Sequence, residues 1–126
     1  YRPPPAAEAQ RILNAELLII PMIETAQAVE NAEAIAAVDG IDVLLIGTSD
    51  LTSEMGIPGE IGHPRVEEAY RQVAEACRKH GKYVGICGQG PSDYPDFADW
   101  LAQEGIVSIS LNPDTVVETW QRLAAN

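Results

Sequence analysis

Two acidic residues follow apolar segments, and together they could bind a cation. The segment "IIPMI" ends at Glu24, and the segment "VLLIG" leads through two small polar residues to Asp50. Carboxylate oxygens are preferred ligands of Mg²⁺ and Mn²⁺, which keep water molecules that a substrate can displace. Acids at the start of a helix also stabilise its positive end without any metal. The spacing therefore leaves two interpretations open, a shared metal site and two helix caps.

Two further groups could take part in chemistry. Ser49 lies in "GTSD" (47–50), where backbone N–H groups could bind a substrate carboxylate or phosphate, although an ordinary turn has the same composition. Cys87 lies in "GICGQGPSD", and its thiol could act as an acid or a base. A lone cysteine is more often a small buried apolar residue. For Cys77, which falls on the apolar face of a predicted helix, we expect only that structural role.

The histidines and tryptophans are better explained by structure than by catalysis. His63 precedes Pro64 at a predicted helix start, and His80 falls at a helix end. Both are expected to cap a helix or to be solvated. Trp100 and Trp120 occupy helical core positions, and we expect them to pack.

Composition excludes several classes of partner. The chain has 126 residues, of which 46% are hydrophobic, and a formal net charge of −11. This charge argues against nucleic acid or an anionic membrane surface as the main partner. No apolar run approaches the roughly 20 residues that span a bilayer, and no signal-peptide pattern is present. The two cysteines fit neither a zinc site nor a disulfide framework, so we expect a cytoplasmic protein.

Strand and helix patterns alternate along the chain. Continuous apolar runs predict strands, and apolar residues three and four apart predict helices. The expected strands cover residues 16–23, 42–47, 82–87 and 106–111, and the expected helices cover 5–14, 26–38, 64–80, 94–105 and a last segment from 114 or 115. The segment "TSEMGIPGEIGHP" is expected to be a loop.

Four βα units in sequence predict an α/β fold with a parallel sheet. Residues 1–126 would then form one domain, either half of a (β/α)₈ barrel or an open flavodoxin-like sheet, since a whole barrel needs about 250 residues. Both architectures place functional groups where strands end. Glu24, Asp50, Cys87 and Asn112 all fall at such ends.

Residues 1–86 resemble the carboxyl-terminal half of the HpcH/HpaI-type class II pyruvate aldolases. The matching pieces are "PMIETAQAVENAEAIAAVDGIDVLLIGTSDL" and "GIPGEIGHPRVEEAYRQVAEACRKHGK". The resemblance implies a barrel lyase that cleaves 4-hydroxy-2-oxo acids to pyruvate and an aldehyde by metal-stabilised enolate formation. It also implies that Glu24 and Asp50 bind Mg²⁺ or Mn²⁺ and that Ser49 and Asp50 bind the substrate, with the backbone at Ser49 holding the pyruvate carboxylate. Met22 stands where many members have a substrate-binding glutamine.

Residues 84–126 resemble the carboxyl-terminal end of phosphoenolpyruvate synthase and related enzymes that use phosphoenolpyruvate. The matching piece begins "GICGQGPSDYPDFADWLAQEG". By this resemblance, Cys87 donates or accepts a proton at the carbon of the enolpyruvate. A natural or designed hybrid of the two families would explain both resemblances, as would a divergent branch.

Several parts of both catalytic machineries are not among these residues. The aldolase base, a His–Asp pair, and its carboxylate-binding arginine come from the first half of the barrel. The phosphate-binding arginines and the phosphohistidine domain of the synthase also lie elsewhere. Three hypotheses remain: a lyase, a phosphotransferase fragment, and a scaffold without turnover. A half barrel leaves two unpaired sheet edges, so we expect a homo-oligomer or pairing with a missing amino-terminal half barrel.

Overall fold

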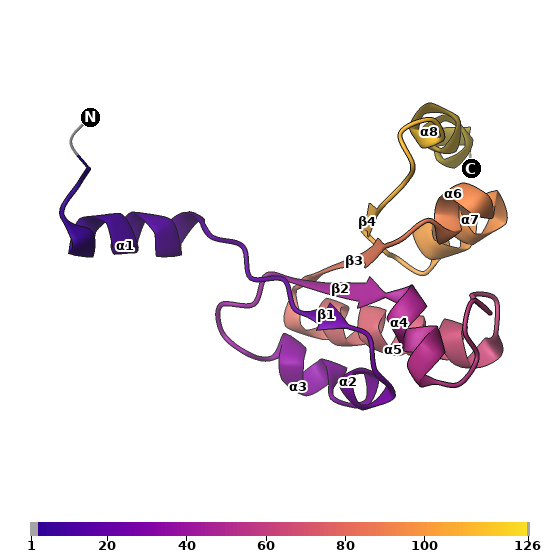
Figure 1. Cartoon of the computed structure of the whole chain (residues 1–126), viewed down its shortest axis with the longest axis horizontal. Helices are drawn as coiled ribbons and strands as arrows, with labels where there is room; N and C mark the ends of the chain where they lie inside the picture. The colour runs from indigo at the N-terminus through magenta and orange to yellow at the C-terminus, as the bar shows by residue number, and fades with distance from the viewer. Residues whose placement is uncertain (1–2, 126) are drawn as a thin grey trace.

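Four parallel strands form one sheet in the order of the chain. A computed structural model describes residues 3–125, and its strand order is β1-β2-β3-β4 (Figure 1). The strands are β1 (Met22–Ile23), β2 (Val43–Gly47), β3 (Tyr83–Cys87) and β4 (Ser108–Ile109). This sequential order is that of a (β/α)₈ barrel, whereas a flavodoxin-like sheet places its first strand between others. The half-barrel prediction is therefore confirmed.

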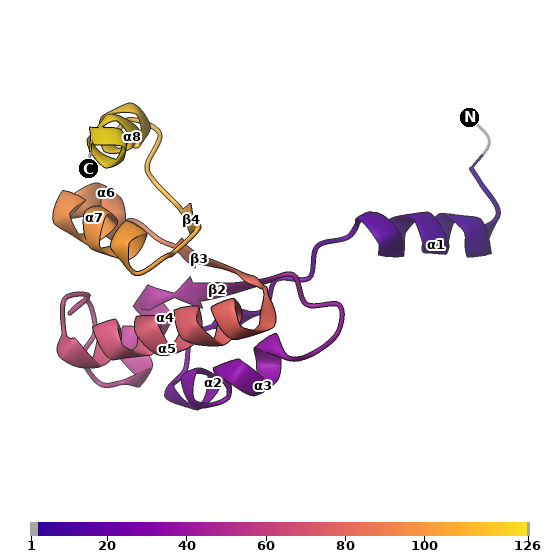
Figure 2. The same ribbon diagram turned by 180° about the vertical axis from the view of Figure 1, so that it is seen from behind.

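Helices separate the strands and cover mainly one face of the sheet. The helices are α1 (Ala6–Glu16), α2 (Ala26–Glu30), α3 (Ala32–Ala36), α4 (Thr48–Glu54), α5 (Pro64–His80), α6 (Gly90–Asp93), α7 (Pro95–Gln103) and α8 (Val116–Ala125). Figures 1 and 2 show α2, α3 and α5 on one side of β1 and β2, while α1 stands apart on an extended arm. Within residues 3–125, no helix combines the length and the apolar character needed to cross a membrane.

The core lies between the sheet and α5. Leu44, Ile46, Val84 and Ile86 alternate along β2 and β3 and are buried. Alternate residues of a strand point to opposite faces, so this set faces the helices. On the other face, Val43, Leu45 and Cys87 are half-buried and Tyr83 is exposed. One covered face and one open face are what half of a barrel requires.

The longest helix begins and ends as its sequence predicts. The ring nitrogen Nδ1 of His63 accepts a hydrogen bond from the backbone N–H of Arg65 at 3.1 Å, and Pro64 occupies the first turn. The helix stops at Gly81, whose φ of +64° favours glycine. His63 is therefore a helix cap, and Cys77 is buried on the apolar face as expected.

The first predicted strand is mostly not a strand. Instead of pairing over residues 16–23, the chain is helical to Glu16 and pairs only at Met22–Ile23. Between these elements it is extended: Ile19 accepts a backbone hydrogen bond from Asp42 (3.1 Å), and Pro21 accepts one from Leu45 (3.0 Å). Pro21 has no N–H to donate, and no strand formed by residues 3–125 lies on the outer edge of β1. Both features explain the short pairing.

Three other boundaries differ from prediction. The helix expected over 26–38 breaks at Asn31 into α2 and α3. A helix, α4, occupies part of the segment expected to be a loop. The strand expected over 106–111 pairs only at Ser108–Ile109, because it is the last strand of the sheet and has a neighbour on one side only.

The prediction that Trp120 packs in the core is wrong. Its side chain on α8 is 72% exposed, whereas Trp100 on α7 stacks against Phe97. Arg122 holds α8 to α7 through Asp96 (2.5 Å) and Asp99 (2.6 Å). Val116 and Val117 of α8 are exposed as well, so much of the predicted apolar stripe of this helix is not covered by the described residues.

Candidate functional site

Glu24 lies over the end of the neighbouring strand, where the strand ends in a glycine. It follows β1 directly, and its carboxylate approaches Gly47, the last residue of β2. A Cβ atom on Gly47 would lie 3.1 Å from Glu24 Oε2 and 3.1 Å from Met22 Cε. Both contacts are closer than side chains normally tolerate, so the glycine makes room for the carboxylate.

Cys87 ends the next strand at the same edge of the sheet. It is paired in register with Gly47, and its Sγ atom lies 3.7 Å from the carbonyl oxygen of Ile46. Residues opposite each other in neighbouring strands point to the same face. Glu24 and Cys87 therefore share one edge and one face, and the thiol is half-buried.

Asp50 and Ser49 lie in the first turn of α4, which begins immediately after β2. Both residues are exposed. The Ser49 carbonyl accepts hydrogen bonds from the Thr52 and Ser53 hydroxyls at 3.0 and 2.8 Å. Its N–H belongs to the first turn of the helix, where N–H groups have no partner within the helix. The strand end thus leads into the turn that carries the second acid.

The structure does not use Glu24 or Asp50 as an N-cap. The cap of α2 is Thr25, whose hydroxyl accepts a hydrogen bond from Ala28 N at 3.0 Å, and the cap of α4 is Gly47. Among residues 3–125, no hydrogen bond or ion pair is made by either carboxylate. Neither carboxylate has a side-chain partner in the part of the chain that the structure describes, although Asp50 lies in the first turn of α4, where a negative charge also stabilises the helix start.

Glu54 is a residue that the sequence reasoning missed. Its carboxylate accepts a hydrogen bond from Ala26 N at 2.8 Å, which ties the end of α4 to the corner that follows Glu24. Glu54 lies four residues after Asp50, and residues at this spacing share one helix face. Two acids four residues apart after an apolar strand could have indicated a helix with both carboxylates on one face.

A buried hydroxyl pair lies beneath the same turn and was also missed. Thr48 and Tyr70 are hydrogen-bonded between Oγ1 and the phenol oxygen at 2.5 Å. Burial raises the pKa of the Tyr70 phenol, which the hydrogen bond to Thr48 lowers in part. A tyrosine in the apolar stripe of a helix usually finds a hydrogen-bond partner for its hydroxyl. The position of Tyr70 in such a stripe could therefore have predicted a buried polar partner.

The donor set fits a hard divalent cation. Carboxylate oxygens suit Mg²⁺, which is commonly held by one or two carboxylates together with water and substrate oxygens. Glu24 and Asp50 supply two such groups on neighbouring strand ends. No cluster of three or more His, Cys, Asp or Glu side chains suited to a metal occurs within residues 3–125.

Asn112, after β4, is half-buried, and its backbone N–H donates to Ser92 Oγ at 2.8 Å.

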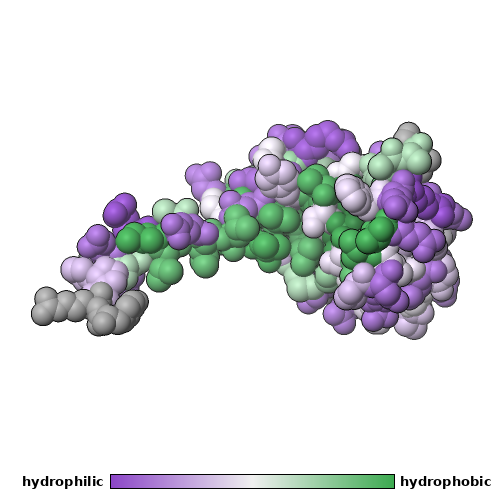
Figure 3. Space-filling view, turned by 90° about the horizontal axis from the view of Figure 1, so that it is seen from above, coloured by the Kyte–Doolittle hydropathy of each residue, from purple (hydrophilic) through white to green (hydrophobic). Residues whose placement is uncertain are grey.

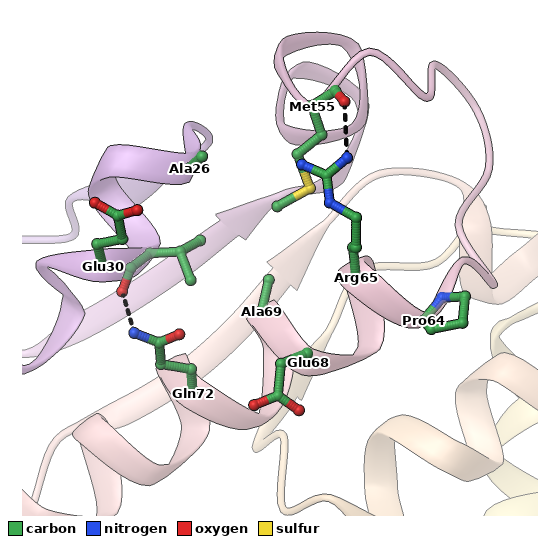
Figure 4. Close-up of a pocket in the computed structure, with 9 residues that line it drawn as sticks. Ala26, Glu30, Met55, Pro64, Arg65, Glu68, Ala69 and Gln72 are labelled. Atoms are coloured by element: carbon green, nitrogen blue, oxygen red, sulfur yellow. Dashed lines mark hydrogen bonds between the residues drawn. The ribbon is translucent and has the colours of Figure 1, made fainter.

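A pocket of about 370 Å³ lies elsewhere, in the helical layer (Figure 4). It is formed between α2 and α5, where Arg65 donates to the Met55 carbonyl (3.1 Å) and Gln72 donates to the Val29 carbonyl (3.0 Å). None of Glu24, Ser49, Asp50 and Cys87 lines it. The predicted site is instead on the open face, where four strands cannot enclose a cavity.

Known proteins with similar sequences include phosphoenolpyruvate synthases and 4-hydroxy-4-methyl-2-oxoglutarate aldolases. A phosphoenolpyruvate synthase from Neisseria meningitidis is 50% identical over 93 residues, which cover 66% of this chain and 12% of that protein. A 4-hydroxy-4-methyl-2-oxoglutarate aldolase from Hapsidospora irregularis is 47% identical over 70 residues, which cover 56% of this chain and 26% of that protein. The synthase alignment is more than twice as long as segment 84–126, so this similarity extends further than its motifs predicted.

Solved structures and a family profile agree on the fold. An HpcH/HpaI aldolase from Desulfitobacterium hafniense superposes with a TM-score of 0.71 and is 28% identical. The match covers 98% of this chain and 47% of that one, so the chain spans about half the length of that structure. The profile of the HpcH/HpaI aldolase/citrate lyase family matches residues 4–105, which is most of the chain, and the chain belongs to this family.

Proposed function

We propose that residues 1–126 form a (βα)₄ half barrel of a metal-dependent carbon–carbon lyase. Its substrates would be 4-hydroxy-2-oxo acids, cleaved to pyruvate and an aldehyde. The observation that carries this proposal is the placement of two unpartnered carboxylates, Glu24 and Asp50, after adjacent parallel strands. Family membership and the similarity to an oxoglutarate aldolase support the same class of reaction.

Glu24 and Asp50 are the proposed ligands of Mg²⁺ or Mn²⁺. The protein CitE from Mycobacterium tuberculosis, which shares the fold at 20% identity and a TM-score of 0.72, was solved in complex with magnesium and acetate. When bound, such a cation polarises the substrate carbonyl and stabilises the negative charge that develops on bond cleavage. Gly47 keeps the space over β2 clear for the Glu24 carboxylate.

Ser49 is the proposed contact for the substrate carboxylate. It lies next to Asp50, is exposed, and offers its backbone N–H at the start of α4. A carboxylate at this position would receive a hydrogen bond and favourable interaction with the helix end. Binding here would orient the 2-oxo acid beside Asp50.

Turnover is proposed to require a second half barrel. By resemblance to the family, the base and the arginine that binds the substrate carboxylate come from the first half of the barrel. This half would be part of a longer protein, or a second copy of the chain would take its place in a homo-oligomer. The open sheet face and the unpaired edges of β1 and β4 support pairing of either kind.

Metal binding tests the proposal directly. Mn²⁺ titration followed by electron paramagnetic resonance should show one site, weakened at least about tenfold in Glu24→Gln and in Asp50→Asn. These amides keep the shape of the side chains and remove one charge each. Glu118→Gln, an exposed change of equal charge on α8, is the matched control. Unchanged affinity in both site variants would remove the metal site, and pyruvate release from a 4-hydroxy-2-oxo acid would then test the lyase in the paired barrel.

A second candidate is a phosphoenolpyruvate-handling phosphotransferase with Cys87 at the reacting carbon. It is favoured by the 50% identity to a phosphoenolpyruvate synthase and by the position of Cys87 on the same edge and face as Glu24. Deuterium exchange at C3 of pyruvate, measured by proton nuclear magnetic resonance, should be lost in Cys87→Ser and kept in Cys77→Ala. Exchange that survives Cys87→Ser would dismiss the thiol. A chain with neither Mn²⁺ binding nor exchange would be a scaffold without turnover.

A further inference from the structure

We infer that Tyr70 is a positioning residue for the site, because its hydroxyl holds Thr48 and thereby fixes the turn that carries Ser49 and Asp50. The importance of this turn for ligand binding rests on the proposed function. That Tyr70 fixes the turn rests on the structure alone, and it can be measured without any ligand.

The phenol ring is itself fixed, so its hydroxyl has a defined place. Tyr70 lies on the buried face of α5 and is 0% exposed. Its ring contacts Phe97 and Trp100 of α7 edge to face, with both pairs of ring centroids 5.8 Å apart. Such contacts with two rings restrict the tyrosine to one orientation. The hydroxyl is therefore presented to Thr48 from a rigid support.

Thr48 links the fixed Tyr70 ring to the turn that carries Ser49 and Asp50. It is the first residue of α4, follows Gly47 without any intervening loop, and is 7% exposed. A seven-residue helix is too short to be stable alone, so tertiary contacts must hold it. Two buried hydroxyls provide them: Thr48 with Tyr70, and Thr52, which accepts from Gly59 N at 3.3 Å.

Of these two contacts, the one at Thr48 holds the amino-terminal end of α4, which carries the proposed binding residues Ser49 and Asp50. Ser49 and Asp50 follow Thr48 directly and are exposed, and the Asp50 carboxylate makes no hydrogen bond to residues 3–125. Their positions are therefore determined by the backbone of the first turn. Removing one member of a buried hydroxyl pair leaves the other without a partner, which costs more than the bond contributes. The first turn would relieve this cost by moving.

Tyr70→Phe tests the inference, because it keeps the ring and removes only the hydroxyl. Hydrogen exchange of the backbone amides of residues 51–55 should become about fivefold faster, with α3 and α8 unchanged. The Mn²⁺ affinity should fall about tenfold, as is typical when a group supporting a metal ligand is removed. Tyr94→Phe, the same chemical change at an exposed tyrosine, is the control and should alter neither quantity.

A second variant separates positioning from general core packing. Thr48→Val should reproduce both effects, and the double variant Tyr70→Phe/Thr48→Val should be no worse than either single variant, because both remove the same bond. Unchanged exchange at residues 51–55 in Tyr70→Phe would overturn the inference, and so would acceleration spread equally over α3 and α8. Local acceleration with unchanged Mn²⁺ affinity would overturn the link to the site. If the unmodified chain binds no Mn²⁺, the proposed function fails, while the exchange data still decide whether Tyr70 fixes the turn.

Discussion

At the scale of single residues, the arrangement of the site depends on the absence of a side chain at Gly47. Gly47 has no Cβ, so the Glu24 carboxylate can lie over the end of β2. The same glycine is paired with Cys87. Gly47 therefore lies between the residue that follows β1 and the last residue of β3. Sequence reasoning placed Glu24 and Cys87 at strand ends correctly, but it had no means of seeing that the glycine between them leaves the space.

The buried thiol Cys77 gives stability a pH dependence that can be measured. Burial raises its pKa to about 11, so the folded state keeps the proton while the unfolded chain, with an ordinary thiol pKa near 8.5, releases it. This contribution is complete below about pH 8.5 and is lost as the pH rises toward 11. Urea unfolding should show that the free energy of unfolding falls by about 2 kcal/mol more in the unmodified chain than in Cys77→Ala over this range. Equal pH slopes in the two proteins would contradict the buried thiol.

At the scale of elements, sequence patterns predicted well the strands that are paired on both edges and the helix that is packed along its length. The residues of β2 and β3 form continuous apolar runs, and α5 has an apolar stripe with a proline at its start and a glycine after its end. These signals are local, so the sequence alone was enough. Elements at the margin of the sheet were predicted poorly, because their length depends on neighbours that β1 and β4 have on one side only.

The error at α4 has a different cause. Its sequence "TSDLTSE" is polar, and serine, threonine and aspartate usually favour turns. The helix forms because Thr48 and Thr52 are buried with hydroxyl partners, namely Tyr70 and the Ser49 carbonyl. Tyr70 is 22 residues from Thr48 and lies on another helix, so no local pattern could reveal the pair. This explains why residues 52–54 were predicted to be part of a loop and instead complete a helix that begins at Thr48.

At the scale of the whole molecule, the chain exposes an apolar band that a stable isolated protein would cover. Figure 3 shows hydrophobic surface running along the arm and onto the body. The members with the largest exposure in this region include Leu17 (63%) and Leu18 (65%) on the arm and Tyr83 (63%) on the open sheet face. Contiguous exposed apolar surface of this kind marks an interaction site. The net charge of −11 opposes association of identical copies.

These two features together predict self-association that depends on salt. Sedimentation at micromolar concentration should give a mass above the 13.6 kDa of one chain, because two half barrels can cover each other's open faces and pair the free edges of β1 and β4. Raising the salt from about 0.01 to 0.15 M should strengthen association, since screening shortens the range of repulsion from about 30 Å to about 8 Å. Leu18→Glu, which adds charge to the band, should weaken it, whereas Leu13→Glu on α1, away from the sheet, should matter less. A monomer at both salt concentrations would show instead that the open face is covered by another chain or by a further part of the same protein.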